Sequence, residues 1–95
     1  MSAFEGALAE YKTALAAAAV DAVTDTQRGL YELHVTTVGQ IEERYRETGS
    51  AYACRLLIEG EGIVHKSDIL KGAASERMRK AFAKLVDAVR EAYGT

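Results

Sequence analysis

The segment LKGAASERMRKAFAKLVDAVREAY, residues 70–93, decides the fold predicted from this sequence. Its apolar side chains recur every three or four residues, the spacing that places them on one face of an α-helix. This apolar stripe consists of Leu70, Ala74, Met78, Phe82, Leu85, Val89 and Ala92. Ser67 or Asp68 is the predicted N-cap and Gly94 the predicted terminator. The segment therefore predicts a long amphipathic helix that buries its stripe against other elements.

A second helix is predicted near the start of the sequence, from about Ser2 to Val23. Its apolar residues are spaced alternately by four and three positions: Phe4, Leu8, Tyr11, Leu15, Ala18 and Ala22. Ser2 and Glu5 have the spacing of a capping box. The same alternation is a short heptad pattern, and the small side chains of residues 16–19 would let a neighbouring helix approach closely. We interpret the stripe as core, with a seam between two copies of the chain as the alternative.

A third helix is predicted over residues 25–47. Thr24 and Gln27 have capping-box spacing at its start. Its stripe would consist of Leu30, His34, Val38, Ile41 and Tyr45. The run LHVTTV at residues 33–38 is rich in β-branched residues, which favour strands. Residues 30–38 therefore remain open between helix and strand, and we adopt the helix.

Residues 52–65 predict a short β-hairpin. Two sets of residues alternate over its first half, with Tyr52, Cys54, Leu56 and Ile58 on one side and Ala53, Arg55, Leu57 and Glu59 on the other. This two-residue period is typical of a strand. Gly60-Glu61-Gly62 would supply the turn, and a short helix capped by Ser50 is the alternative. The predicted fold is mainly α, with three antiparallel helices and a hairpin before the C-terminal helix, an α+β arrangement.

The composition predicts one small domain spanning residues 1–95. Hydrophobic residues make up 48% of the chain and charged residues 27%, near the averages of globular proteins. The longest uncharged apolar run, residues 14–20, is too short to cross a bilayer, so we expect no membrane partner. The first residues lack a signal-peptide pattern, and the single cysteine, Cys54, fits a reducing compartment. A cytoplasmic protein is the resulting expectation.

Signals of catalysis and metal binding are weak in the sequence. Cys54 and His65 are the only plausible nucleophile and base, and the predicted hairpin would hold their Cβ atoms roughly 7 Å apart. That separation is too loose for a nucleophile–base pair, so we expect no enzyme activity. His34 and His65 stand far apart in the sequence, and neither Cys-x-x-Cys nor His-Glu-x-x-His spacing occurs. We therefore expect no metal site and no cofactor.

Charge is distributed unevenly along the chain. Residues 1–65 carry five basic and ten acidic side chains, a net charge of −5, whereas residues 66–95 carry seven and four, a net charge of +3. Arg77, Lys80 and Lys84 share one side of the predicted C-terminal helix and could contact a polyanion. Glu76 and Asp87 lie among them, and no aromatic residue on that side could stack on a base. A nucleic-acid-binding regulator is therefore the alternative function.

The main functional prediction is a small non-enzymatic interaction protein that acts as a homo-oligomer, most simply a dimer. An isolated hairpin is only marginally stable and has open edges, the two charge regions could pair between copies, and the first helix offers a heptad-like seam. The expected partners are a second copy of the chain and a larger protein complex, in which this protein would be an assembly subunit, adaptor or inhibitor. The candidate interface residues come from these segments and from the middle helix: Leu8, Tyr11, Leu15, Ala18, Tyr31, Tyr52, Cys54, Leu56 and Ile58.

Overall fold

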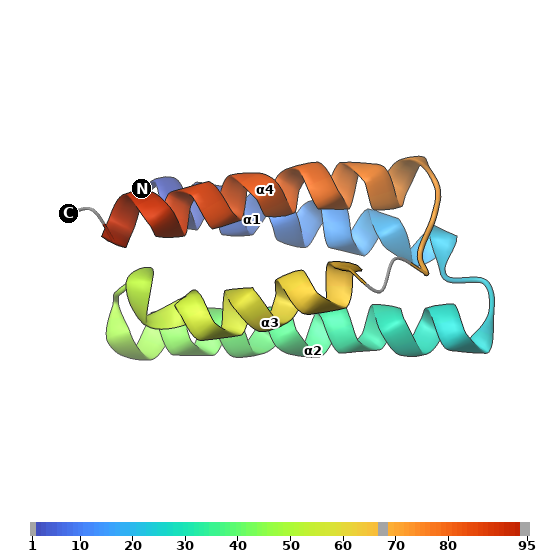
Figure 1. Cartoon of the computed structure of the whole chain (residues 1–95), viewed down its shortest axis with the longest axis horizontal. Helices are drawn as coiled ribbons and strands as arrows, with labels where there is room; N and C mark the ends of the chain where they lie inside the picture. The colour runs from blue at the N-terminus through green and yellow to red at the C-terminus, as the bar shows by residue number, and fades with distance from the viewer. Residues whose placement is uncertain (1, 67–68, 94–95) are drawn as a thin grey trace.

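Two antiparallel pairs of α-helices form the structure, a computed structural model that describes residues 2–66 and 69–93 (Figure 1). The helices are α1 (Ala3–Ala17), α2 (Asp25–Thr48), α3 (Arg55–Lys66) and α4 (Ala73–Tyr93), with short 3₁₀ helices η1 (Ala18–Asp21) and η2 (Tyr52–Cys54). Helix α1 packs against α4, and α2 packs against α3. The resulting bundle measures 41 × 20 × 20 Å.

The predicted β-hairpin is wrong, because the described residues contain no strand and residues 55–66 form helix α3. Ile58 and Glu61 are buried on one face of α3, whereas Leu56 and Ile63 are exposed on the opposite face. Apolar residues on both faces of a helix imitate the alternation of a strand over a short run. The fold is therefore mainly α with four helices, and the ambiguous residues 30–38 are helical within α2.

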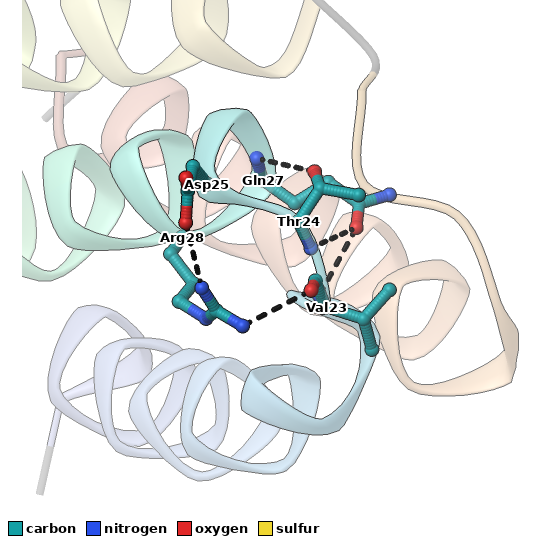
Figure 2. Close-up of polar contacts among 5 residues, drawn as sticks. All are labelled: Val23, Thr24, Asp25, Gln27 and Arg28. Atoms are coloured by element: carbon teal, nitrogen blue, oxygen red, sulfur yellow. Dashed lines mark hydrogen bonds and ion pairs between the residues drawn. The ribbon is translucent and has the colours of Figure 1, made fainter.

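The predicted start of α2 is confirmed by a complete capping box (Figure 2). The backbone N–H of Gln27 donates to the Thr24 hydroxyl at 3.1 Å, and the Gln27 side-chain oxygen accepts from the backbone N–H groups of Thr24 and Val23, each at 3.0 Å. Arg28 donates to Asp25 and to the Val23 carbonyl in the same turn. These bonds satisfy backbone donors that a helix start otherwise leaves open.

The start of α4 differs from its prediction. Helix α4 begins at Ala73, while the predicted caps Ser67 and Asp68, like the predicted terminator Gly94, lie outside the described residues. The cap comes instead from η1, because the Asp21 carboxylate accepts from the backbone N–H and the hydroxyl of Ser75, both at 2.8 Å. A residue far away in the sequence thus fixes where α4 starts.

The core confirms the apolar stripes predicted for the first and last helices. Most of the predicted side chains are buried, namely Phe4, Leu8, Tyr11, Leu15 and Ala18 in the first and Leu70, Met78, Leu85 and Val89 in the last. Phe82 is half-buried and packs against this core. From α2, Val38 and Ile41 join it together with a polar residue, His34.

Candidate functional site

Four polar side chains meet inside the bundle, and we refer to them as the buried cluster: Tyr11 from α1, His34 from α2, and Glu61 and His65 from α3. Tyr11 and Glu61 have no exposed surface, His34 is 1% exposed, and His65 is half-buried. Glu61 and His65 are four residues apart on α3 and therefore lie on the same side of that helix. Three helices thus contribute polar groups to one enclosed point of the fold.

The four side chains contact one another in the order His34, Glu61, Tyr11 and His65. The Tyr11 hydroxyl donates to Glu61 Oε2 and lies 2.8 Å from His65 Nε2. Glu61 Oε1 lies 3.0 Å from His34 Nδ1. These last two atoms are close but not aligned for hydrogen bonding, so each is buried without a hydrogen-bond partner among the described residues. Buried polar atoms of this kind are rare in folded proteins and call for an explanation.

Burial determines the protonation of two members of the cluster. Desolvation, followed by the nearby negative charge of Glu61, raises the pKa of Tyr11 above its ordinary value. Desolvation, followed by the charges of His34 and Arg79, lowers the pKa of His65 to about 4. At neutral pH, Tyr11 is therefore an uncharged hydroxyl and His65 an uncharged imidazole with a free lone pair.

Metal coordination is one chemistry that this arrangement can support. His34, Glu61 and His65 each offer one donor atom, and all three donor atoms lie within 4.8 Å of one another. The expectation of no metal site rested on the distance between His34 and His65 along the sequence. In the folded chain, their ring centroids are only 4.7 Å apart.

The buried cluster was missed at the level of sequence because the hairpin prediction placed Glu61 in a turn and His65 on a strand. The available signal was the position of His34 within an otherwise apolar helical stripe. A second signal was the spacing of Glu61 and His65, which is one helical turn. Neither becomes informative until residues 55–66 are recognised as a helix.

Six of the nine candidate interface residues are core residues of the folded chain. Leu8, Tyr11, Leu15, Ala18, Cys54 and Ile58 are buried. Tyr31 and Tyr52 are half-buried, and Leu56 is exposed. The stripe of α1 therefore packs against the chain's own helices, and Leu56 is the candidate that remains open to a partner.

The exposed side of α3 carries apolar residues that the chain itself does not cover. Leu56 and Ile63 are each 66% exposed and seven residues apart, so they lie on the same side of the helix. Gly60 lies between them, and a Cβ atom built there would meet nothing within 4 Å. We define Leu56, Gly60 and Ile63 as the α3 outer face. It points away from the buried side formed by Ile58 and Glu61.

The candidate polyanion contacts Arg77, Lys80 and Lys84 all lie on the exposed side of α4. Lys84 Nζ is 2.8 Å from the Glu10 carboxylate of α1, so its charge is already paired within the chain. This pairing reduces the positive charge that the surface could offer to phosphate groups.

Cys54 and His65 do not form a reactive pair. They are eleven residues apart, close to opposite ends of α3, which corresponds to roughly 16 Å along a helix axis. The Cys54 thiol is fully buried, and its Sγ donates to the Ile41 carbonyl at 3.6 Å. Desolvation raises the pKa of this thiol, although Arg44 opposes the shift.

We expect Cys54 to react slowly with iodoacetamide at pH 8 in the folded protein, because the thiol is buried and its raised pKa disfavours the thiolate. Unfolding in denaturant should restore the rate of an ordinary exposed cysteine. Alkylation kinetics followed by mass spectrometry measure both rates. Equal rates in the folded and unfolded protein would contradict the burial of Cys54.

Comparison with protein-family models, curated proteins and solved structures returned no match to this chain. None of the described helices is both long enough and apolar enough to span a bilayer. Any functional assignment therefore depends on the geometry of the buried cluster and of the α3 outer face.

Proposed function

We propose that this chain is a small non-enzymatic interaction protein that forms a homo-oligomer, most simply a dimer, through the α3 outer face. The observation that carries the proposal is the 66% exposure of both Leu56 and Ile63 on one side of a helix whose other side fills the core. A helix that is apolar on opposite sides is typically covered on both. Contiguous exposed apolar patches are typical of interaction sites, and Leu56 and Ile63 lie on one side of the same helix.

A second copy of the chain is the partner that this surface fits best. A two-fold contact joins the same surface of both subunits, so the surface must complement itself. In an antiparallel pairing of two α3 helices, Leu56 of each copy would pack on Ile63 of the other. Gly60 would lie near the centre, where the lack of a side chain allows the helix backbones to approach closely. The net charge of −2 is small enough that two copies repel each other weakly.

The predicted hairpin edge and the predicted seam on α1 do not support self-association. There is no hairpin edge to cover, because residues 55–66 are helical. The seam predicted on α1 is occupied by the chain's own core. The α3 outer face is the interface that we propose in their place. We also propose a role in a larger complex and a cytoplasmic location.

Sedimentation equilibrium at several concentrations tests the proposal. We expect a species of twice the chain mass of 10.3 kDa at tens of micromolar. The double variant Leu56→Glu/Ile63→Glu should be monomeric at the same concentration, because two carboxylates per subunit would enter the interface. Circular dichroism should show unchanged helix content, since both side chains are exposed in the single chain.

The matched control is Val20→Glu/Val23→Glu. These two residues are 74% and 67% exposed and lie near the α1–α2 connection rather than on α3. We expect this control to dimerise like the original chain. A strict monomer of the original chain would reject self-association, and a dimer insensitive to the α3 variant would place the interface elsewhere.

Nucleic-acid binding has less support than self-association, because Lys84 is paired with Glu10. Salt-sensitive retention of the chain on heparin or DNA, lost in Arg77→Gln/Lys80→Gln, would favour that alternative.

A further inference from the structure

We propose that the buried cluster binds one divalent transition-metal ion of the Zn²⁺ class, with His34, Glu61 and His65 as ligands. This inference is independent of self-association, because the buried cluster lies on the opposite side of α3 from Leu56 and Ile63.

The donor atoms match the chemistry of such an ion. Zn²⁺ is bound by imidazole nitrogen and carboxylate oxygen, whereas Ca²⁺ and Mg²⁺ prefer oxygen donors alone. Metal–ligand bonds of roughly 2.0–2.2 Å in a tetrahedral site hold neighbouring donors roughly 3.3–3.6 Å apart. His34 Nδ1 and Glu61 Oε1 are already 3.0 Å apart, and all three donor atoms lie within 4.8 Å of one another. Small side-chain rotations would therefore bring the three donor atoms to these separations.

Two buried atoms without hydrogen-bond partners support the metal site independently of the donor geometry. His34 Nδ1 and Glu61 Oε1 face each other without hydrogen-bond alignment among the described residues. A metal ion accepts lone pairs from both atoms at once and compensates the charge of a carboxylate that has no exposed surface. This pair of unsatisfied atoms is thus accounted for by a cation between them.

Tyr11 is assigned as a positioning residue. Its hydroxyl donates to Glu61 Oε2 and lies 2.8 Å from His65, so it contacts two of the three proposed ligands. When Glu61 Oε1 binds the ion, the Tyr11 hydrogen bond to Oε2 would hold the carboxylate plane in place. Removing a residue that hydrogen-bonds a metal ligand commonly lowers metal affinity by about 10–100-fold.

Helix geometry provides the rigid support that a metal site needs. Glu61 and His65 are four residues apart on α3, and His34 comes from the adjacent α2, so ligands project from facing helices as in bundle metal sites. The ring of Phe82 stacks on His65 with centroids 4.4 Å apart and limits its rotation. Three protein ligands would leave the fourth position of a tetrahedral ion to a water molecule.

Isothermal titration calorimetry of the full chain, freed of metal with a chelator, provides the first test with Zn²⁺ alone. We expect one ion per chain and a raised thermal unfolding midpoint, since an ion that binds only the folded state stabilises it. Titration with Co²⁺ should give the visible absorption of tetrahedral Co²⁺ with nitrogen and oxygen ligands. Absence of both signals would overturn the proposal without any variant.

The matched variants are Glu61→Gln and Glu59→Gln. Both remove one carboxylate from α3, but Glu61 is buried in the cluster and Glu59 is exposed. Glu61→Gln should lower the affinity at least 100-fold, and Glu59→Gln should leave it unchanged. Equal binding by both variants would assign the metal to surface groups and overturn the proposal. Should Glu61→Gln unfold, the Co²⁺ spectrum of Tyr11→Phe decides instead, with weaker binding and an altered spectrum expected.

The variant Leu56→Glu/Ile63→Glu tests whether metal binding is independent of the proposed self-association. This variant should bind one ion as tightly as the original chain, because both substitutions lie on the exposed side of α3. Failure of self-association would therefore leave the metal titration unaffected.

Discussion

Gly72→Ala is expected to lower the free energy of unfolding by roughly 2–5 kcal/mol, through backbone strain and loss of a helix cap. Gly72 has a φ of +136°, a conformation that side-chain-bearing residues rarely adopt. A Cβ atom at this position would lie 2.3 Å from Asp21 Oδ1. The Asp21 carboxylate would have to move, and it is the group that accepts from the backbone N–H and the hydroxyl of Ser75. Urea unfolding followed by circular dichroism measures the loss.

Gly39→Ala is the matched control for this prediction. Gly39 lies within α2, and a Cβ atom there would meet nothing within 4 Å. Alanine should therefore stabilise the fold by about 0.5–1 kcal/mol, since glycine is the poorer helix former. If Gly72→Ala lowers the free energy of unfolding and Gly39→Ala raises it, the effect at Gly72 comes from its conformation and from Asp21. A change below 0.5 kcal/mol at Gly72, on the order of an ordinary surface substitution, would contradict this account.

Glu61→Ala is expected to destabilise the metal-free protein by about 3–5 kcal/mol, the usual cost of removing one partner from a buried charged contact. The substitution removes the acceptor of the Tyr11 hydroxyl and the only close polar contact of His34 Nδ1 that the described residues provide. It also leaves a cavity, because Glu61 has no exposed surface. Denaturant unfolding in the presence of a chelator gives the metal-free value.

A double-mutant cycle separates the lost interaction from the lost volume. His34→Leu/Glu61→Leu replaces both partners with apolar side chains of similar size, which is often neutral in protein interiors. The double variant should lose less free energy of unfolding than His34→Leu and Glu61→Leu lose together. We expect the difference, the coupling energy, to be about 0.5–3 kcal/mol. Strict additivity would show that the contact between His34 and Glu61 contributes nothing to stability.

Three of the four helices could be predicted from the sequence because each has one apolar stripe, although the end of α1 at Ala17 and the start of α4 at Ala73 differ from the predicted bounds. The stripe from Phe4 to Ala18 and the capping box of Thr24 and Gln27 both occur in the structure as expected. The fourth, α3, was only the alternative to the predicted hairpin, because Leu56 and Ile63 lie opposite Ile58. Without a single apolar stripe, the two-residue alternation was the stronger local signal, and packing against α2 overrode it.

The buried cluster lay beyond sequence reasoning for a different reason. Tyr11 fits the apolar stripe of α1 by spacing, so nothing in the sequence distinguishes it from a neighbouring core residue. Its hydroxyl contacts Glu61 and His65, which are 50 and 54 positions away. Such a contact depends on how the two helix pairs pack, and periodicity within each helix carries no information about that packing.

The ribosome completes α1 well before it synthesises α4, the helix against which α1 packs. These two helices pack along much of their length, yet residues 18–72 separate them in the sequence. At a synthesis rate of roughly 5–20 residues per second, about 3–11 seconds pass between completion of α1 and the first residue of α4. Throughout that interval, the stripe of α1 has no α4 to cover it. The nascent chain therefore exposes an apolar surface to which a chaperone could bind before folding is complete.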